Sequence, residues 1–167
     1  MITMPPRLGL LFVLLLLAPA RAAEVGSADL EQRDKALFVK TPVIRRLAFS
    51  GGLAPAWSKN FGWMYVDKRG KVVIQGVMKM DNGPDAFHDG LVRLERGGKC
   101  GFADQKGAIR VPLIYDGCLG FERGKARVCV KCRLECAEKE CEHHAYKGGD
   151  WRCVGPWGDR VACPPLP

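Results

Sequence analysis

The sequence predicts an all-β protein built from stacked antiparallel repeat units. Three observations support this fold class. A Phe-x-x-Gly motif occurs three times, an Asp-x-x-Gly motif follows it at a nearly constant distance in two units, and alternating apolar residues flank both motifs. Because a fixed sequence period indicates a repeat architecture, we expect each unit to bury one face of the next.

The first motif extends to Phe-x-x-Gly-x-(Ala/Val)-x-apolar and occupies residues 49–56, 87–94 and 121–128. Its phenylalanines are 38 and then 34 residues apart. Glycine tolerates the positive φ that a tight turn requires, and alternating apolar residues face one side of a sheet. Each copy therefore predicts a turn that leads into a strand.

The second motif connects two apolar runs in residues 63–74 and 100–111, where it reads Asp67-x-x-Gly70 and Asp104-x-x-Gly107. Such a connection predicts a hairpin, in which the aspartate makes Asx-type hydrogen bonds to the turn backbone. Each unit then contributes about three short strands. In the third unit Gly155 replaces the aspartate and Gly158 keeps the glycine.

The third unit also predicts an insertion. Gly52 precedes Asp67 by 15 residues, whereas Gly124 precedes Gly155 by 31. The extra residues, about 16 of them, fall within a cysteine-rich stretch at about 129–148.

This pattern resembles the WG-repeat family, whose bacterial arrays repeat Phe-x-x-Gly-Leu-Ala, then Trp-Gly-Tyr-Ile-Asp-x-x-Gly, then an Ile-Pro strand. The Trp-Gly pair is degenerate here, because the aligned pairs are Trp63-Met64, Cys100-Gly101 and Trp151-Arg152. Residues 111–116 match the Ile-Pro-x-x-Tyr-Asp connector. The resemblance implies an open, propeller-like or solenoid-like array in an exported bacterial member of the family.

The resemblance covers residues 47–162, with units at about 47–84, 85–118 and 119–162. Residues 163–167 form a C-terminal tail. For residues 23–46 we expect an N-terminal cap, in which a short helix is followed by a capping strand.

Residues 1–22 have the order of a secretory signal peptide. A basic start is followed by an uncharged apolar run over residues 8–18 and a small-residue site at residues 20–22, which places cleavage between Ala22 and Ala23. The run is too short to span a bilayer, which needs about 20 helical residues. We therefore expect a periplasmic or secreted protein with no transmembrane segment in the mature chain.

The charge pattern favours no nucleic-acid partner. The full chain has 26 Lys and Arg against 18 Asp and Glu, and the predicted leader contains two of the arginines. The basic residues are spread along the chain without a run of five. Attraction to anionic surfaces is one interpretation of this balance, and ordinary solvated charge is the interpretation we prefer.

All eight cysteines lie in the second half of the chain: Cys100, Cys118, Cys129, Cys132, Cys136, Cys141, Cys153 and Cys163. After a signal peptide, disulfides are the default reading of such a set. Eight cysteines allow 105 pairings, and the sequence does not choose among them.

The insertion leaves two other chemistries open. It contains more than the four ligands that a tetrahedral zinc site takes: Cys129, Cys132, Cys136, Cys141, His143 and His144. Thiolates must, however, survive an oxidising compartment. Cys129-x-x-Cys132 beside Lys131 and Arg133 also has the charge that favours a reactive thiolate, but it lacks the strand-to-helix setting of a redox enzyme.

The sequence shows no catalytic constellation. We therefore predict an exported, non-enzymatic interaction or structural module without a cofactor, whose partner is a protein or an envelope component. The alternative is an extracytoplasmic metal-binding or thiol-redox protein that uses the Cys129–Cys141 cluster. Neither the ligand nor the oligomeric state follows from the sequence.

Overall fold

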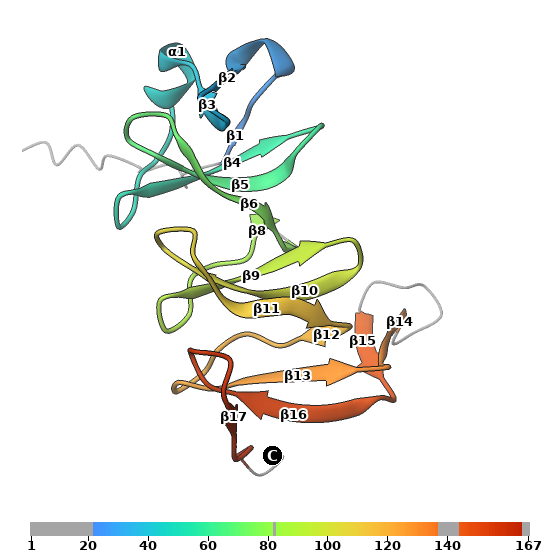
Figure 1. Cartoon of the computed structure of the whole chain (residues 1–167). Coiled ribbons are helices and arrows are strands. Elements are labelled where there is room, and N and C mark those ends of the chain that lie inside the picture. The colour runs from blue at the N-terminus through green and yellow to red at the C-terminus, as the bar shows by residue number, and fades with distance from the viewer. Residues whose placement is uncertain (1–21, 82, 137–143, 165–167) are drawn as a thin grey trace, which may run out of the picture.

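The computed structural model describes residues 22–81, 83–136 and 144–164. It shows three antiparallel units stacked in chain order (Figure 1), which confirms the predicted fold class. The units contain three strands each: β4 (Leu53–Ser58), β5 (Gly62–Asp67) and β6 (Val72–Val77); β9 (Leu91–Arg96), β10 (Lys99–Asp104) and β11 (Ile109–Tyr115); β13 (Ala126–Val130), β16 (Asp150–Val154) and β17 (Arg160–Val161).

Short elements connect the units. The hairpin of β7 (Lys79–Met80) and β8 (Gly83–Pro84) lies between the first two units, and β12 (Gly117–Cys118) pairs with the edge of β13. A single bridge from Val77 to Leu94 joins β6 to β9. The units are therefore held together mainly by packing between their faces.

The Phe-x-x-Gly motifs form the predicted tight turns. In the second unit Asp89 and Gly90 have φ values of 50° and 78°, while His88 and Leu91 exchange backbone hydrogen bonds of 2.8 and 2.9 Å. The same positive φ pair recurs in the other two units. Asp89 also accepts a 2.7 Å hydrogen bond from the Gly124 amide, so turns of successive units contact each other.

The Asp-x-x-Gly motifs make the predicted Asx-type bonds. Asp104 Oδ1 accepts hydrogen bonds from the amides of Lys106 and Ala108 at 2.8 and 3.0 Å, and Asp67 does the same in the first unit. In the third unit a Cβ added at Gly155 would lie 2.6 Å from the carboxylate of Asp159. The later aspartate thus fills the space that the missing side chain leaves.

In the second and third units, the glycine of this turn contacts the last strand of the preceding unit. A Cβ at Gly107 would lie under 3.0 Å from the Val73 carbonyl on β6, and one at Gly158 would lie 3.3 Å from the Arg110 carbonyl on β11. A Cβ at Gly70 would meet the Val39 carbonyl in the same way, although Val39 belongs to the N-terminal segment. β3 (Ala36–Val39) therefore takes the place of a third strand from a preceding unit.

The N-terminal segment contains both expected kinds of element, but in the opposite order. After β1 (Ala23–Glu24) and a 3-10 turn at Ser27–Asp29, β2 (Leu30–Arg33) and β3 form a hairpin, and α1 (Thr41–Ile44) follows. The expectation of a helix before the capping strand was wrong. Asp34 and Lys35 adopt positive φ and turn the chain back, and Pro42 is compatible only with the first helical turn.

Three apolar layers alternate with the cap and the units. Between units, a phenylalanine of the turn motif packs against an aromatic ring on the middle strand of the preceding unit, tilted in one pair and edge to face in the other. Phe87 lies 4.9 Å from Tyr65 and Phe121 lies 4.7 Å from Phe102, measured between ring centroids. The repeated phenylalanine thus acts as a packing residue, as its repeat position predicts.

Candidate functional site

The cysteine-rich insertion forms a hairpin outside the stack. β14 (Arg133–Cys136) and β15 (His144–Lys147) pair only with each other among the described strands. The chain leaves the third unit through Lys131 and returns through Gly148 and Gly149, all with positive φ. In Figure 1 β15 lies nearer to the stack and β14 lies outermost.

A disulfide closes the base of the hairpin. Cys129 and Cys132 are bonded to each other, with their Cα atoms 6.0 Å apart, and only 0% and 5% of these residues is exposed. The Lys131 amide between them donates a 2.7 Å hydrogen bond to Asp116, which also accepts from Lys99 Nζ at 2.5 Å. These two hydrogen bonds lower the pKa of Asp116, the lysine contributing more.

Tyr146 anchors the hairpin on the stack. Its half-buried ring packs on Gly117 of β12, where an added Cβ would lie 2.8 Å from two ring carbons. It meets Trp151 edge to face, with 6.1 Å between the centroids. The indole Nε1 of Trp151 in turn donates to the Gly148 carbonyl at 3.0 Å. Burial raises the pKa of Tyr146.

A hollow of about 260 Å³ separates the hairpin from the second unit. Its lining combines apolar side chains with carboxylates: Met78, Glu95, Gly98, Cys100, Asp116, Cys132, Leu134 and Tyr146. Leu134 is 55% exposed and lies opposite Tyr146 in the hairpin ladder. We refer to this hollow as the hairpin groove.

The outermost strand of the hairpin is solvent-exposed along its whole length. All four residues of β14 are exposed. Arg133 lies directly opposite Lys147 in the ladder, and its Nε lies 4.0 Å from a carboxylate oxygen of Glu135. Leu134 and Tyr146 were not predicted as site residues. The signal was present, because they are the large aliphatic and the aromatic residue of an insertion in which charged residues dominate.

The predicted disulfides are confirmed for six cysteines, paired as Cys100–Cys118, Cys129–Cys132 and Cys153–Cys163. Cys136 is also disulfide-bonded. Cys141 lies outside the described residues. The first pair joins β10 to β12, so it links the second unit to the strand that leads into the third.

The structure does not bring the candidate zinc ligands together among the described residues. Cys129 and Cys132 share a disulfide and offer no thiolate in this state, while Cys141 and His143 lie outside the described residues. His144 is exposed at the start of β15. Within the described part of the chain, no three His, Cys, Asp or Glu side chains gather as a metal-binding group.

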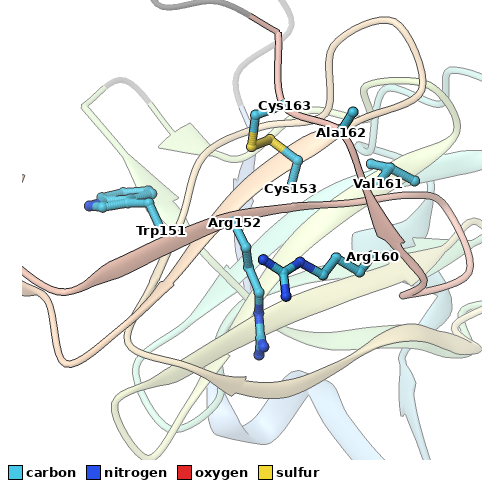
Figure 2. A pocket seen from close by; sticks show the side chains of 7 residues that line it. All are labelled: Trp151, Arg152, Cys153, Arg160, Val161, Ala162 and Cys163. Atoms are coloured by element: carbon cyan, nitrogen blue, oxygen red, sulfur yellow. A yellow bond between two sulfur atoms is a disulfide. The ribbon is translucent and has the colours of Figure 1, made fainter.

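A second hollow, of about 390 Å³, lies in the third unit beside β16, β17 and the segment that follows β17 (Figure 2). The Trp151 indole and the Cys153–Cys163 disulfide lie on one side of β16, and Arg152 and Arg160 extend to the other. Cys153 occupies the position that Tyr65 and Phe102 hold in the other units. Where those rings receive a phenylalanine, Cys153 is bonded to the C-terminal tail instead.

Cations hold this tail in place. Lys125 Nζ donates to the Ala162 carbonyl at 3.1 Å and Arg127 donates to the Pro164 carbonyl at 2.6 Å. Lys125 stands at the repeat position that is Leu53 and Leu91 in the other units. At this position the third unit is therefore polar where the first two units are apolar. The C-terminal tail, bonded through Cys163, covers part of its outward face.

One carboxylate among the described residues is buried, and an arginine neutralises it. Asp85 is 2% exposed and accepts two hydrogen bonds from the Arg93 guanidinium, at 3.0 and 2.5 Å, and a third from the Arg93 amide at 2.9 Å. Tyr65 donates to the Asp85 carbonyl at 2.8 Å. Burial, and then the charge of Asp85, raises the pKa of Tyr65. This network joins the first two units.

The fold and the hairpin together define a disulfide-stapled, all-β repeat protein. Residues 101–131 match the family model described as WG containing repeat. The resemblance drawn from the sequence is thereby confirmed, and the chain contains a WG repeat. The matched segment runs from the middle of β10 through β13, so it spans the junction of the second and third units.

No curated protein and no solved structure shows significant similarity to the chain. The predicted signal peptide lies almost entirely in residues 1–21, outside the described residues. Of the helices in the described part of the chain, none is long and apolar enough to cross a membrane.

Proposed function

We propose that this protein is an exported, non-enzymatic interaction module whose insertion hairpin contacts a protein or an envelope component. One observation carries the proposal: β14 is exposed along its whole length while its hairpin is fixed to the stack. The Cys129–Cys132 disulfide, the Asp116 hydrogen bond and the Tyr146 contact all restrict the hairpin. An ordered, protruding surface loses little conformational entropy when it binds.

Export is supported by the disulfides. Three pairs within about 65 residues are typical of proteins from oxidising compartments, because cytosolic thiols are kept reduced. Among the described residues, the first strand begins at Ala23, directly after the predicted cleavage site. Both features agree with removal of a leader before folding.

Site-specific photo-crosslinking in the cells that produce the protein tests the contact. A photoreactive amino acid replaces Leu134 on the hairpin in one variant and Ile109 on β11 in a control. The two side chains are 55% and 50% exposed, so their accessibility is matched. We expect a discrete adduct from position 134 and none of that mass from position 109. Identical adduct patterns from both positions would refute the hairpin as the contact surface.

The alternative of a metal-binding or thiol-redox protein is tested by intact mass. The purified mature protein is alkylated before and after reduction. We expect no alkylation before reduction, since the six paired cysteines and Cys136 are bonded. Alkylation of all eight thiols in the unreduced sample, or zinc in the native mass, would favour the alternative. The burial of Cys129 and Cys132 argues against exchange with a partner thiol.

A further inference from the structure

We propose that the outer edge of β14 binds an extended, acidic segment of a partner protein, which adds to the hairpin as a third strand. This inference rests on the proposed function, because it specifies how the hairpin makes its contact. Strand addition to an exposed sheet edge is a general mode of peptide recognition, in which backbone hydrogen bonds supply affinity and alternate side chains supply specificity.

The backbone of β14 provides the edge. It pairs with β15 over four residues, from Arg133↔Lys147 to Cys136↔His144, and with no other described strand. In an antiparallel pair, alternate residues direct their N–H and C=O groups away from the partner strand. All four residues of β14 are exposed, and apart from β15 no described strand pairs with them. Their outward-directed groups are a short row of donors and acceptors in the geometry that a third strand requires.

The two faces of the hairpin differ in chemistry. Leu134 and Tyr146 share one face and line the hairpin groove. Arg133, Glu135 and Lys147 lie on the opposite face, because successive side chains of a strand alternate. An added strand would continue both faces. Its apolar residues would lie beside Leu134 toward the groove, and its polar residues would lie beside Arg133.

Charge selects the polar residues of that strand. Like charges directly opposite each other destabilise a sheet, yet Arg133 faces Lys147. Glu135 compensates only in part, because it lies 4.0 Å from the Arg133 guanidinium. The groove side contains Glu95 and Asp116, so a carboxylate is disfavoured there and favoured beside Arg133. A segment that alternates acidic with apolar residues satisfies both faces.

The same charges limit unwanted pairing. Short edges with charged side chains are a common protection against edge-to-edge aggregation. β14 has four residues, and two of them are charged. The edge is thus open to a strand of complementary charge and closed to most others.

The test uses the full mature protein with its disulfides intact and four synthetic ten-residue peptides. The first alternates Glu and Val, and the second alternates Lys and Val. The third and fourth are the Glu-Val peptide with N-methyl groups on every second amide, one peptide for each phase. N-methylation removes the donors that a strand ladder needs. Hydrogen exchange of the backbone amides is followed by NMR at about 1 mM peptide, roughly a thousandfold above a micromolar Kd. It reports which residues each peptide protects.

We expect the Glu-Val peptide to slow exchange of the outward-facing β14 amides at least about tenfold, and the Lys-Val and N-methylated peptides to leave them unchanged. R133E should reverse the preference in favour of Lys-Val. R123E is the matched control, because Arg123 is exposed in the turn before β13, at the other end of that strand, and it should keep the preference for Glu-Val. The amide spectrum of each variant verifies its fold.

Protection of amides elsewhere, equal protection by both N-methylated peptides, or an unchanged preference in R133E would each overturn the inference. Absence of binding by both charged peptides would also overturn it. Protection of β14 in the peptide-free protein at high concentration would indicate a second copy of the chain as the occupant. The crosslink from position 134 decides the proposed function separately, since it does not depend on how the partner is bound.

Discussion

Replacing Gly107 with alanine tests how the units are held together. Gly107 ends an Asp-x-x-Gly turn with φ of 81°, and a Cβ there would lie under 3.0 Å from the Val73 carbonyl of the preceding unit. Alanine therefore meets two separate penalties. The left-handed conformation costs a residue with a Cβ about 1–2 kcal/mol, and forcing an atom into packed structure costs about 1–3 kcal/mol more.

Gly52→Ala separates the two penalties. Gly52 has φ of 88°, but nothing lies within 4 Å of an added Cβ, so only the conformational penalty of about 1–2 kcal/mol applies. We expect G107A to lower the free energy of unfolding by about 2–5 kcal/mol, the sum of both penalties. G70A should resemble G107A, because its Cβ would meet the Val39 carbonyl as closely.

The assay is urea unfolding of the oxidised protein, followed by tryptophan fluorescence and by circular dichroism. The informative quantity is the difference between G107A and G52A, which isolates the contact between units. Equal losses of stability in these two variants would show that the turn glycine serves only its own turn, and would refute the docking role assigned to it. If G107A lost the expected free energy of unfolding and G70A lost none, the equivalence of β3 with a third strand would be refuted.

Two further perturbations follow from the site and the turns. Removing the Cys153–Cys163 disulfide with C153A/C163A should lower the free energy of unfolding by about 3 kcal/mol, from the entropy of a loop with a sequence separation of 10; unchanged stability under non-reducing conditions would contradict this. For Asp104, burial raises the pKa, but hydrogen bonds from the Ala108 amide, Arg110 and the Lys106 amide outweigh it and the net pKa is lowered. Its stabilisation is then complete above the usual value of about 3.9 and is lost as the pH falls through the lower folded-state pKa, so D104N should lose less stability than wild type below about pH 4 in acid titrations of unfolding.

The repeat units were predictable because each depends on local residues. A turn with two positive φ values needs glycine at a fixed place, and an Asx turn needs an aspartate three residues before its glycine. Both signals are visible in a single sequence. The insertion was predictable for the same reason, since Gly124 and Gly155 are too far apart for an ordinary unit.

The cap and the cysteine pairing were not predictable, because they depend on distant contacts. Nothing in Ala36-Leu37-Phe38-Val39 marks it as the equivalent of a third strand; its role follows from where Gly70 meets it. Likewise, Cys153 pairs with Cys163 because the tail crosses the outward face of the third unit. The position of the hairpin depends on Tyr146 reaching Gly117, which no local motif encodes.

The position of β3 has a consequence for how such proteins change in evolution. β3 offers a backbone carbonyl to the turn glycine of the first unit, as β6 does to the turn glycine of the second. A unit can therefore pack on the cap or on another unit. The cap does not depend on how many units follow. Duplication or loss of a whole unit would therefore keep the turn-glycine contact at each junction, whereas the Asp85–Arg93 pair and the Cys100–Cys118 disulfide each belong to one junction. This backbone contact therefore sets no limit on the number of units between the cap and the final, disulfide-bonded unit.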